Sequence, residues 1–289
     1  MNEIYIKARA KINLNLLVLD KREDNYHNIK SVFQKINLYD EIFLKKINTD
    51  EFKIITNVEK INNKENIIYK AYMKLKEKYK NITGVQVTLN KKIPMQAGMA
   101  GGSTDCAAFM ILMNKLFDLK LSKKNMSDLG KELGADVIPC LYNKPVIAEG
   151  IGDIITKIDT NFKYYLVIIK PEMSCSTKDM YKKIDKKKIS QKDTTKEIVE
   201  ALEKSDIEML ASNLYNVFEE VVEQKELIRD IKQEIINNGA ISSLMTGSGS
   251  AVYGIFKDKN AAKIAYESLK DKYQTYICTS YNSRNHYII

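Results

Sequence analysis

Cysteine and histidine are scarce in this chain of 289 residues, which has four cysteines and two histidines. The cysteines form no C-x-x-C pair and lie far apart, at Cys106, Cys140, Cys175 and Cys278. Only His27 and His286 could join them, so we do not expect a structural zinc site, which needs four such ligands at short spacings. Separate, reduced thiols fit a cytosolic protein better.

Long apolar runs are also absent. No run approaches the ~18 apolar residues that a membrane helix requires, and the N-terminal residues lack the apolar core of a signal peptide. We therefore expect a cytoplasmic protein with no membrane partner. The 44% hydrophobic and 29% charged content is ordinary for a globular protein, and the length fits one large or two ordinary domains.

Arginine contributes little to the net charge of +9. A basic protein can bind nucleic acid, a membrane surface or small anions. Here the excess is mostly lysine in loop-like stretches such as 181–192, and no basic stripe alternates with aromatic residues as in single-strand binders. A solvated, lysine-rich surface is the favoured interpretation, and a basic RNA-binding protein is the alternative.

Periodicity outlines the elements. Alternation predicts strands at 4–9, 12–16, 29–38, 41–47, 51–56, 84–90, 145–149 and 153–158, with polar turns at 20–28 and 37–40. Helices are predicted at 66–79, 103–116 and 122–134, and Pro139 should stop any helix that follows. From Tyr164 a second set begins, with a first strand there, later strands at 241–245, 251–256 and 275–280, and helices at 177–184, 195–203, 207–222, 226–237 and 261–270. This order predicts an α+β unit with an antiparallel sheet, and we place the domain boundary near residue 160.

The most informative stretch is 92–110, KIPMQAGMAGGSTDCAAFM. A strand leads into a loop with Gly98, Gly101 and Gly102, and a helix follows. This order is typical of an anion site, because glycine lets backbone N–H groups approach a phosphate and the start of a helix adds free N–H groups. Ser103 or Thr104 should cap that helix, or point its hydroxyl at a phosphate or Mg2+. The stretch is neither a Walker A loop nor a Rossmann fingerprint, and a plain strand-to-helix turn is the alternative.

The pattern P-x-x-A-G-x-x-G-G-S-S/T-D-x-A-A in this stretch resembles the phosphate loop of the GHMP kinases, in which glycine often stands where this chain has Gln96 and Ala100. Three other segments of that family occur in the same order: A-K-I-N-L with Lys11, G-A-D-V with Asp136, and T-G-S-G from Thr246. Alone, Lys11 and Asp136 would be typical surface or turn residues. Four motifs in order make the resemblance far more specific.

The resemblance implies an α+β, two-domain GHMP kinase fold. Residues 1–160 would form the N-terminal domain, which is like one found in ribosomal proteins and carries the ATP-binding glycine loop. Residues 161–289 would form a ferredoxin-like α+β C-terminal domain. The implied activity is ATP-dependent phosphorylation of an alcohol group on a small molecule, with ATP and Mg2+ as cofactors, no nucleic-acid or membrane partner, and a monomer or homodimer.

It also implies the site residues. Asp136 would accept the proton of the acceptor hydroxyl, or only orient it, and Lys11 would stabilise the transferring group. The implied nucleotide-binding residues are Pro94, Gly98, Ala100, Gly101, Gly102, Ser103 and Thr104. The implied substrate-binding residues are Asn13, Tyr26, His27, Gly150, Gly247 and Ser248. Lys91 and Lys92 would either help to hold the nucleotide or be solvated, and no metal ligand is assigned.

The segment REDNYH, with SVFQ and LYDE after it, resembles the branch of the family that phosphorylates the 2-hydroxyl of a cytidine diphosphate-linked methylerythritol in the non-mevalonate isoprenoid pathway. There, Tyr26 would stack on the cytosine base and His27 would hydrogen-bond to it. Asn25 replaces the usual glycine and also tolerates a left-handed turn. Pro139 is one place later than usual after Asp136. A kinase of homoserine or mevalonate is the rival, which the Tyr-His turn disfavours.

Overall fold

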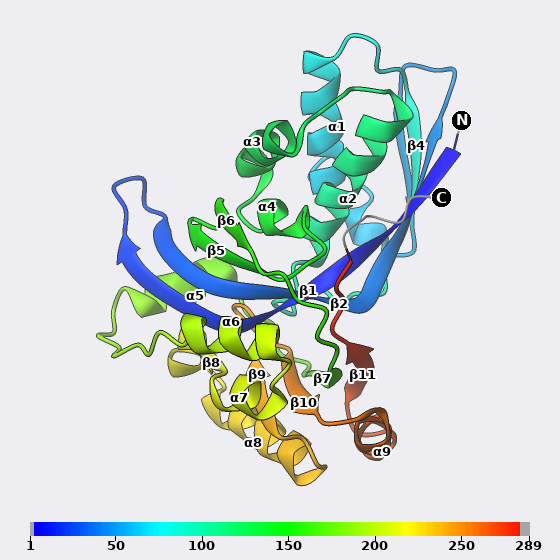
Figure 1. The fold of residues 1–289 in the computed structure, drawn as a ribbon. Helices are drawn as coiled ribbons and strands as arrows, with labels where there is room; N and C mark the ends of the chain where they lie inside the picture. Colours follow the sequence, from blue (N-terminus) through cyan, green and yellow to red (C-terminus); the bar gives the residue numbers. More distant parts are fainter. Residues whose placement is uncertain (1–2, 284–289) are drawn as a thin grey trace.

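The computed structural model of the chain describes residues 3–283. His286 and the outer ends of the two expected domains lie outside this range. Within it, the strands form a seven-stranded sheet and a separate four-stranded sheet. Figure 1 shows helices α1 to α4 on one side of two long strands, and the four-stranded sheet with its helices on the other.

The two long strands are β1 (Glu3–Lys21) and β2 (His27–Lys46), which pair antiparallel along almost their whole length. The prediction of two shorter strands in each place, with a turn at 37–40, is wrong. Register shifts at Arg9/Lys11 and Asn13/Asn15 show how β1 bends without breaking, because a bulge absorbs one residue and turns the strand. Asn25 does adopt the left-handed conformation in the turn between them, with φ of 66°.

The first sheet has the order β3-β4-β2-β1-β8, and β5 and β6 extend it from β2. Its other strands are β3 (Phe52–Thr56), β4 (Val85–Asn90), β5 (Val146–Gly150), β6 (Ile154–Lys157) and β8 (Tyr215–Asn216). The helices beside it are η1 (Glu59–Ile61), α1 (Ile67–Lys78), α2 (Gly101–Leu116), α3 (Lys123–Leu133) and α4 (Val137–Cys140). As predicted, Asn66 caps α1 and Ser122 caps α3, each accepting a hydrogen bond from a backbone N–H group.

The second sheet is antiparallel, in the order β11-β7-β10-β9, which confirms the predicted α+β unit. Its strands are β7 (Tyr165–Lys170), β9 (Ser242–Met245), β10 (Val252–Phe256) and β11 (Gln274–Thr279). Its helices are α5 (Thr177–Ile184), α6 (Thr195–Lys204), α7 (Ile207–Ser212), η2 (Val217–Glu220), α8 (Lys225–Asn237) and α9 (Lys259–Leu269).

The predicted single helix over 207–222 is wrong, because the chain leaves the helix after Ser212. The Asn216 side chain donates to the carbonyl oxygens of Met245 (2.6 Å) and Gly247 (2.9 Å) and accepts from the Phe218 N–H (3.0 Å). These buried bonds tie β8 to the end of β9 and to the loop after it, while β8 pairs parallel with β1. Tertiary bonding therefore overrides a sequence pattern that is compatible with a helix.

Strand β1 contributes to three hydrophobic clusters in turn. Ile4 and Ile6 pack with α1 and α2, Ile12 and Leu14 pack with the second sheet, and Leu16 packs with α8 and α9. Burying each of these side chains contributes about 1.5–3 kcal/mol. The division near residue 160 falls between β6 and β7, and we retain it as a proposal because β1 serves both halves.

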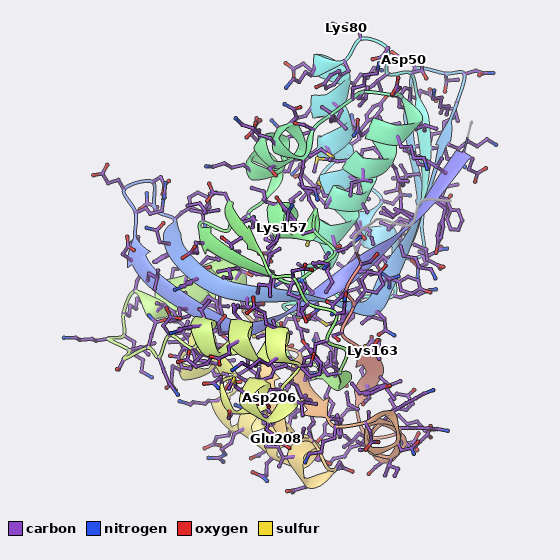
Figure 2. The ribbon with its side chains drawn as sticks, in the orientation of Figure 1. Asp50, Lys80, Lys157, Lys163, Asp206 and Glu208 are labelled. Atoms are coloured by element: carbon purple, nitrogen blue, oxygen red, sulfur yellow. The ribbon has the colours of Figure 1, made fainter. Side chains whose placement is uncertain are left out.

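Charged side chains lie at both ends of the molecule rather than in one stripe. Figure 2 shows Lys80 and Asp50 at one end and Asp206 and Glu208 at the other. Many surface lysines pair with a carboxylate, as Lys76 does with Asp50 and Lys257 with Glu208, which weakens the RNA-binding alternative. In residues 3–283, no helix has both the length and the apolar character needed to cross a membrane.

Candidate active site

A cleft of about 670 Å3 lies where the glycine loop meets residues 246–250 of the second half. Most of the residues expected at the site line it: Lys11, Asn13, Pro94, Gly98, Ala100, Gly101, Gly102, Ser103, Asp136, Gly247 and Ser248. Four expected residues are not in its lining, namely Tyr26, His27, Thr104 and Gly150. One concave site therefore collects residues that are far apart in the chain.

The glycine loop leaves the start of α2 open toward the cleft. The helix begins at Gly101, earlier than predicted, and no side chain caps it. The first N–H groups of an α-helix have no partner within the helix, so this end favours an anion. Gln96 (φ 52°) and Ala100 (φ 54°) are left-handed, at the positions where the GHMP loop often has glycine. Each costs about 1–2 kcal/mol of strain, which glycine would avoid.

The glycine loop and the loop 246–250 meet backbone to backbone. A Cβ atom added to Gly98 would lie 2.0 Å from the Thr246 carbonyl oxygen, and one added to Gly247 would lie 2.6 Å from the Gly98 oxygen. The Ala251 N–H donates to the Ala97 carbonyl oxygen at 3.3 Å. Glycine at positions 98 and 247 therefore lets the two sides of the cleft touch.

Lys11 and Asp136 face each other in the cleft, with Nζ 3.5 Å from Oδ2. Lys11 also donates to Asn13 Oδ1 at 2.8 Å, and its Nζ lies 4.7 Å from the centre of the Phe33 ring. The interpretation of Lys11 as a surface turn residue is wrong, because it is buried inside β1. A fixed cation beside a carboxylate is suited to transfer of a negatively charged group.

Asp136 is held by the single helical turn α4, where the expectation that Pro139 stops any helix is wrong. Pro139 is the third residue of α4. The first N–H groups of a helix need no intrahelical partner, so proline is tolerated there. The shifted proline leaves Asp136 in the lining of the cleft.

Thr104 does not reach the cleft. Its hydroxyl donates to the Arg9 carbonyl oxygen at 2.6 Å and accepts from Lys35 Nζ at 2.8 Å, and the residue is buried. The expected role of Thr104 as a cap or phosphate ligand is therefore corrected: it ties α2 to β1 and β2. Ser103, one residue earlier, does line the cleft.

Lys91 belongs to a buried triad, which the sequence analysis missed. Its Nζ pairs with Asp40 and, at 2.6 Å, with Asp105. Asp40 Oδ1 also accepts from the N–H groups of Lys92 (2.5 Å) and Ile93 (2.8 Å), which fixes the chain entering the glycine loop. The expectation of a solvated Lys91 is wrong, because its side chain is buried in this network. Lys91 also lines the cleft, so its contact with the nucleotide stays a prediction, and Lys92 pairs with Glu41 at 2.7 Å.

The charges of this triad are unequal. Burial raises the pKa of Asp105 well above its usual value, and Asp40 adds to this against the opposing effect of Lys91. Burial would lower the pKa of Lys91, but Asp105 and Asp40 outweigh it and raise that pKa. In the described part of the chain, Asp105 Oδ1 has no hydrogen-bond partner. A proton on Asp105 would leave the triad neutral beneath the glycine loop.

Tyr26 and His27 do not form one surface, contrary to the expectation. Neighbouring residues at the start of a strand point to opposite sides, and Tyr26 is 57% exposed while His27 is buried. His27 Nε2 lies 2.6 Å from Asp185 Oδ1, and its ring stacks on Tyr181 with centroids 4.9 Å apart. Gly150, at the end of β5, also lies away from the cleft lining.

Helix α5 supplies cleft residues that the sequence analysis did not assign to the site, and it placed Tyr181 in a solvated, lysine-rich stretch. Tyr181 lines the cleft, and Thr177 Oγ1 lies 2.8 Å from Ser248 Oγ. Burial raises the pKa of Tyr181, and the nearby charge of Asp136 adds to this. The available signal was the apolar spacing of Met180, Tyr181 and Ile184, which the surrounding lysines obscured.

Two family models match the chain. The GHMP kinases N terminal domain matches residues 66–144, and the GHMP kinases C terminal domain matches residues 198–275. The chain is 39% identical to the 4-diphosphocytidyl-2-C-methyl-D-erythritol kinase of Alkaliphilus metalliredigens, over 98% of this chain and 99% of the relative. It is also 39% identical to the enzyme of that name from Clostridioides difficile, over 97% and 96% of the two chains.

Solved structures confirm the two-domain fold. A 4-(cytidine 5'-diphospho)-2C-methyl-D-erythritol kinase aligns with a TM-score of 0.84 at 24% identity, over 96% of this chain and 100% of that one. Homoserine kinase from Cytophaga hutchinsonii aligns with a TM-score of 0.78 at 18% identity, over 100% and 98%. The fold is thus shared by kinases with different acceptors, whereas the two full-length sequence relatives described above carry one name. The chain belongs to the GHMP kinases and, among them, to the family of the 4-diphosphocytidyl-2-C-methyl-D-erythritol kinases.

Proposed function

We propose that this protein transfers the γ-phosphoryl group of ATP to the 2-hydroxyl of 4-diphosphocytidyl-2-C-methyl-D-erythritol, a step of the non-mevalonate isoprenoid pathway. The observation that carries the proposal is the Lys11–Asp136 pair in a cleft whose other wall is the glycine loop. The full-length relatives support the choice of acceptor. The cytoplasmic location and the monomer or homodimer state remain predictions.

The nucleotide would lie along the glycine loop. Its phosphates would meet the open start of α2, where Gly101, Gly102 and Ser103 line the cleft. The same end of the cleft has apolar walls suited to a purine ring, formed by Ile61, Ile67, Leu89, Ile93 and Pro94. One site thus combines an anion-binding backbone with an apolar slot.

The cleft also fits a Mg2+ ion that arrives with ATP. Mg2+ keeps several waters and takes one or two carboxylates in addition to substrate phosphates. The carboxylate of Glu65, which lines the cleft and is 85% exposed, would hold it, which leaves Asp136 free for the acceptor hydroxyl. Among residues 3–283, no group of three metal-binding side chains forms a separate cage. When bound, the ion would neutralise charge on the transferring group.

The acceptor would enter from the side of α5. Thr177 and Ser248 offer hydroxyl groups there, and Tyr181 offers an aromatic face. Asp136 would accept the proton of the 2-hydroxyl as that oxygen attacks the phosphoryl group. Lys11 would stabilise the negative charge on the oxygens of the group in flight.

The test is a coupled assay of ADP release with four acceptors: the diphosphocytidyl compound, methylerythritol phosphate, homoserine and mevalonate. We expect turnover only with the first, because the other three offer no base to the wall formed by α5. Turnover of homoserine or mevalonate at an equal or higher rate would refute the acceptor and leave the kinase family intact. A uridine analogue of the acceptor serves as the matched control for recognition of the base.

A further inference from the structure

Lys35 is a buried lysine next to the catalytic pair. It is paired with Lys11 in the register of β1 and β2, so both side chains leave the same face of the sheet. Lys11 reaches the cleft, whereas Lys35 lies beneath α2 and is 4% exposed. Lysine is almost never fully buried without an ionic partner.

The contacts of Lys35 match an uncharged amine. Its Nζ donates to the Arg9 carbonyl oxygen and to Thr104 Oγ1, both at 2.8 Å. A neutral amine has two N–H groups and one lone pair, whereas an ammonium has three N–H groups. The two oxygens satisfy the two N–H groups of an amine, and within residues 3–283 no carboxylate pairs with Lys35, whose other polar neighbour is the Cys140 thiol.

The charges around Lys35 also favour the neutral form. Burial lowers the pKa of Lys35, the cations Lys11 and Arg9 of β1 add to this, and Cys140 of α4 opposes it only in part. Burial raises the pKa of the Cys140 thiol, which therefore provides no thiolate. Tyr142 and Lys144 line the small void next to Lys35 and add no negative charge.

The link to the cleft runs through α2. Thr104, which accepts from Lys35, is in the first turn of this helix, directly after Ser103 in the cleft lining. A triphosphate at that turn would bring negative charge close to Lys35 through an interior where charges act strongly. It would also offset the charge of Lys11, which otherwise disfavours a proton on Lys35.

We propose that Lys35 is an uncharged amine in the empty enzyme and takes up a proton when the triphosphate of ATP occupies the cleft. The inference rests on the proposed function, because it requires ATP at the glycine loop. Lys35 is then a positioning residue that acts through Thr104 and α2, and nucleotide binding is coupled to proton uptake. Affinity for ATP falls as pH rises, by at most about tenfold per pH unit for one proton.

Titration calorimetry with a non-hydrolysable ATP analogue, in two buffers of different ionisation enthalpy, counts the protons taken up. Work above pH 7.5 keeps the analogue's own phosphates ionised. We expect clear uptake by the wild type and a markedly smaller value for Lys35→Met, which keeps the length of the side chain without its charge. The matched control is Lys92→Met, a nearby exposed lysine paired with Glu41, which should take up as many protons as the wild type.

Binding without proton uptake, or equal uptake by Lys35→Met and the wild type, would overturn the inference alone. A lack of any analogue binding would overturn the proposed function with it. If Lys35→Met does not fold, NMR of wild-type enzyme labelled with 13C at lysine Cε decides the matter. One buried lysine should shift from its amine to its ammonium position on addition of the analogue, and unchanged lysine signals would refute the proposal.

Discussion

Lys11 Nζ and Asp136 Oδ2 lie 3.5 Å apart, yet the Lys11 side chain is 4% exposed and that of Asp136 is 41% exposed. Lys11 is held by its contacts with Asn13 and the Phe33 ring, while the Asp136 carboxylate keeps one side open to the cleft. An incoming hydroxyl group can therefore approach Asp136 without displacing Lys11. The pair combines a fixed cation with an accessible proton acceptor.

Replacing Asp136 with asparagine tests this arrangement. Asp136→Asn keeps the shape of the side chain and removes its charge and basicity. We expect kcat to fall by ~10²-fold or more, the usual scale for loss of a general base, with little change in affinity for ATP. Steady-state assays and nucleotide titrations measure both quantities. Asp179→Asn, on the exposed face of α5, is the control, and near-normal kcat in Asp136→Asn would reduce Asp136 to a turn residue.

The contact between the two loops predicts that alanine destabilises the protein at one glycine of the loop and not at another. In Gly98→Ala the new Cβ would lie 2.0 Å from the Thr246 oxygen, in a left-handed backbone with φ of 71°. We expect a loss of about 2–4 kcal/mol in the free energy of unfolding from overpacking and strain. In Gly102→Ala the nearest atom would be 4.0 Å away, so stability should hold. Denaturant unfolding compares them, and equal stability would contradict the contact.

The buried triad predicts a pH effect on stability. The pKa of Asp105 is raised in the folded state, so its contribution is full below the unfolded value of about 4 and is lost as pH rises through the folded value. Asparagine cannot ionise, so Asp105→Asn should gain stability relative to the wild type as pH increases from 5 to 8. Unfolding in denaturant at several pH values measures this.

The control for that series is Asp179→Asn. The pKa of Asp179 is lowered by its hydrogen bonds to Lys182 and Ser176, so its contribution is already complete above about pH 4. The curve for this variant should run parallel to that of the wild type over the same range. A parallel curve for Asp105→Asn as well would show that Asp105 is ionised in the folded protein.

The contact between His27 and Asp185 predicts an effect on the acceptor alone. His27 lies outside the cleft lining but stacks on Tyr181, which lines it, so His27→Ala should loosen that wall. An aromatic pair contributes about 0.5–1.5 kcal/mol, so KM for the diphosphocytidyl substrate should rise roughly 2- to 10-fold. Asp185→Ala should raise it in the same direction, because Asp185 orients the His27 ring. KM for ATP should stay near its wild-type value in both. Asp193→Ala, which breaks the exposed pair with Lys30, is the control, and a matching rise there would remove the special role of His27.

The order of strand, glycine loop and helix could be predicted from the sequence, because each of these elements depends on residues that are close together in the chain. The lengths of β1 and β2 could not, because bulges at Arg9/Lys11 and Asn13/Asn15 keep the ladder intact where the pattern suggests a break. The family resemblance, rather than spacing, brought Lys11 and Asp136 together as a pair.

The buried residues that support the site could not be predicted from the sequence, for a different reason. Asp40 and Lys91 meet only because β2 pairs with β4 in a register that the sequence does not state. Lys35 was overlooked because a lysine in a strand is usually solvated. Asn216 shows the same limit, since its bonds to Met245 and Gly247 depend on a distant loop.

Strand β1 runs unbroken from the hydrophobic cluster around α1 and α2 to the cluster around α8 and α9. The two halves of the protein are therefore joined by a continuous strand rather than by a flexible linker. A hinge motion would have to bend this strand and break the ladder with β2. Strand β8 of the C-terminal half pairs parallel with β1 at Asn15 and Leu16 and supports the same strand. We therefore expect ligands to enter and leave through small movements of the segments that border the cleft, chiefly the two glycine loops and α5. Rotation of one half of the protein away from the other is not expected.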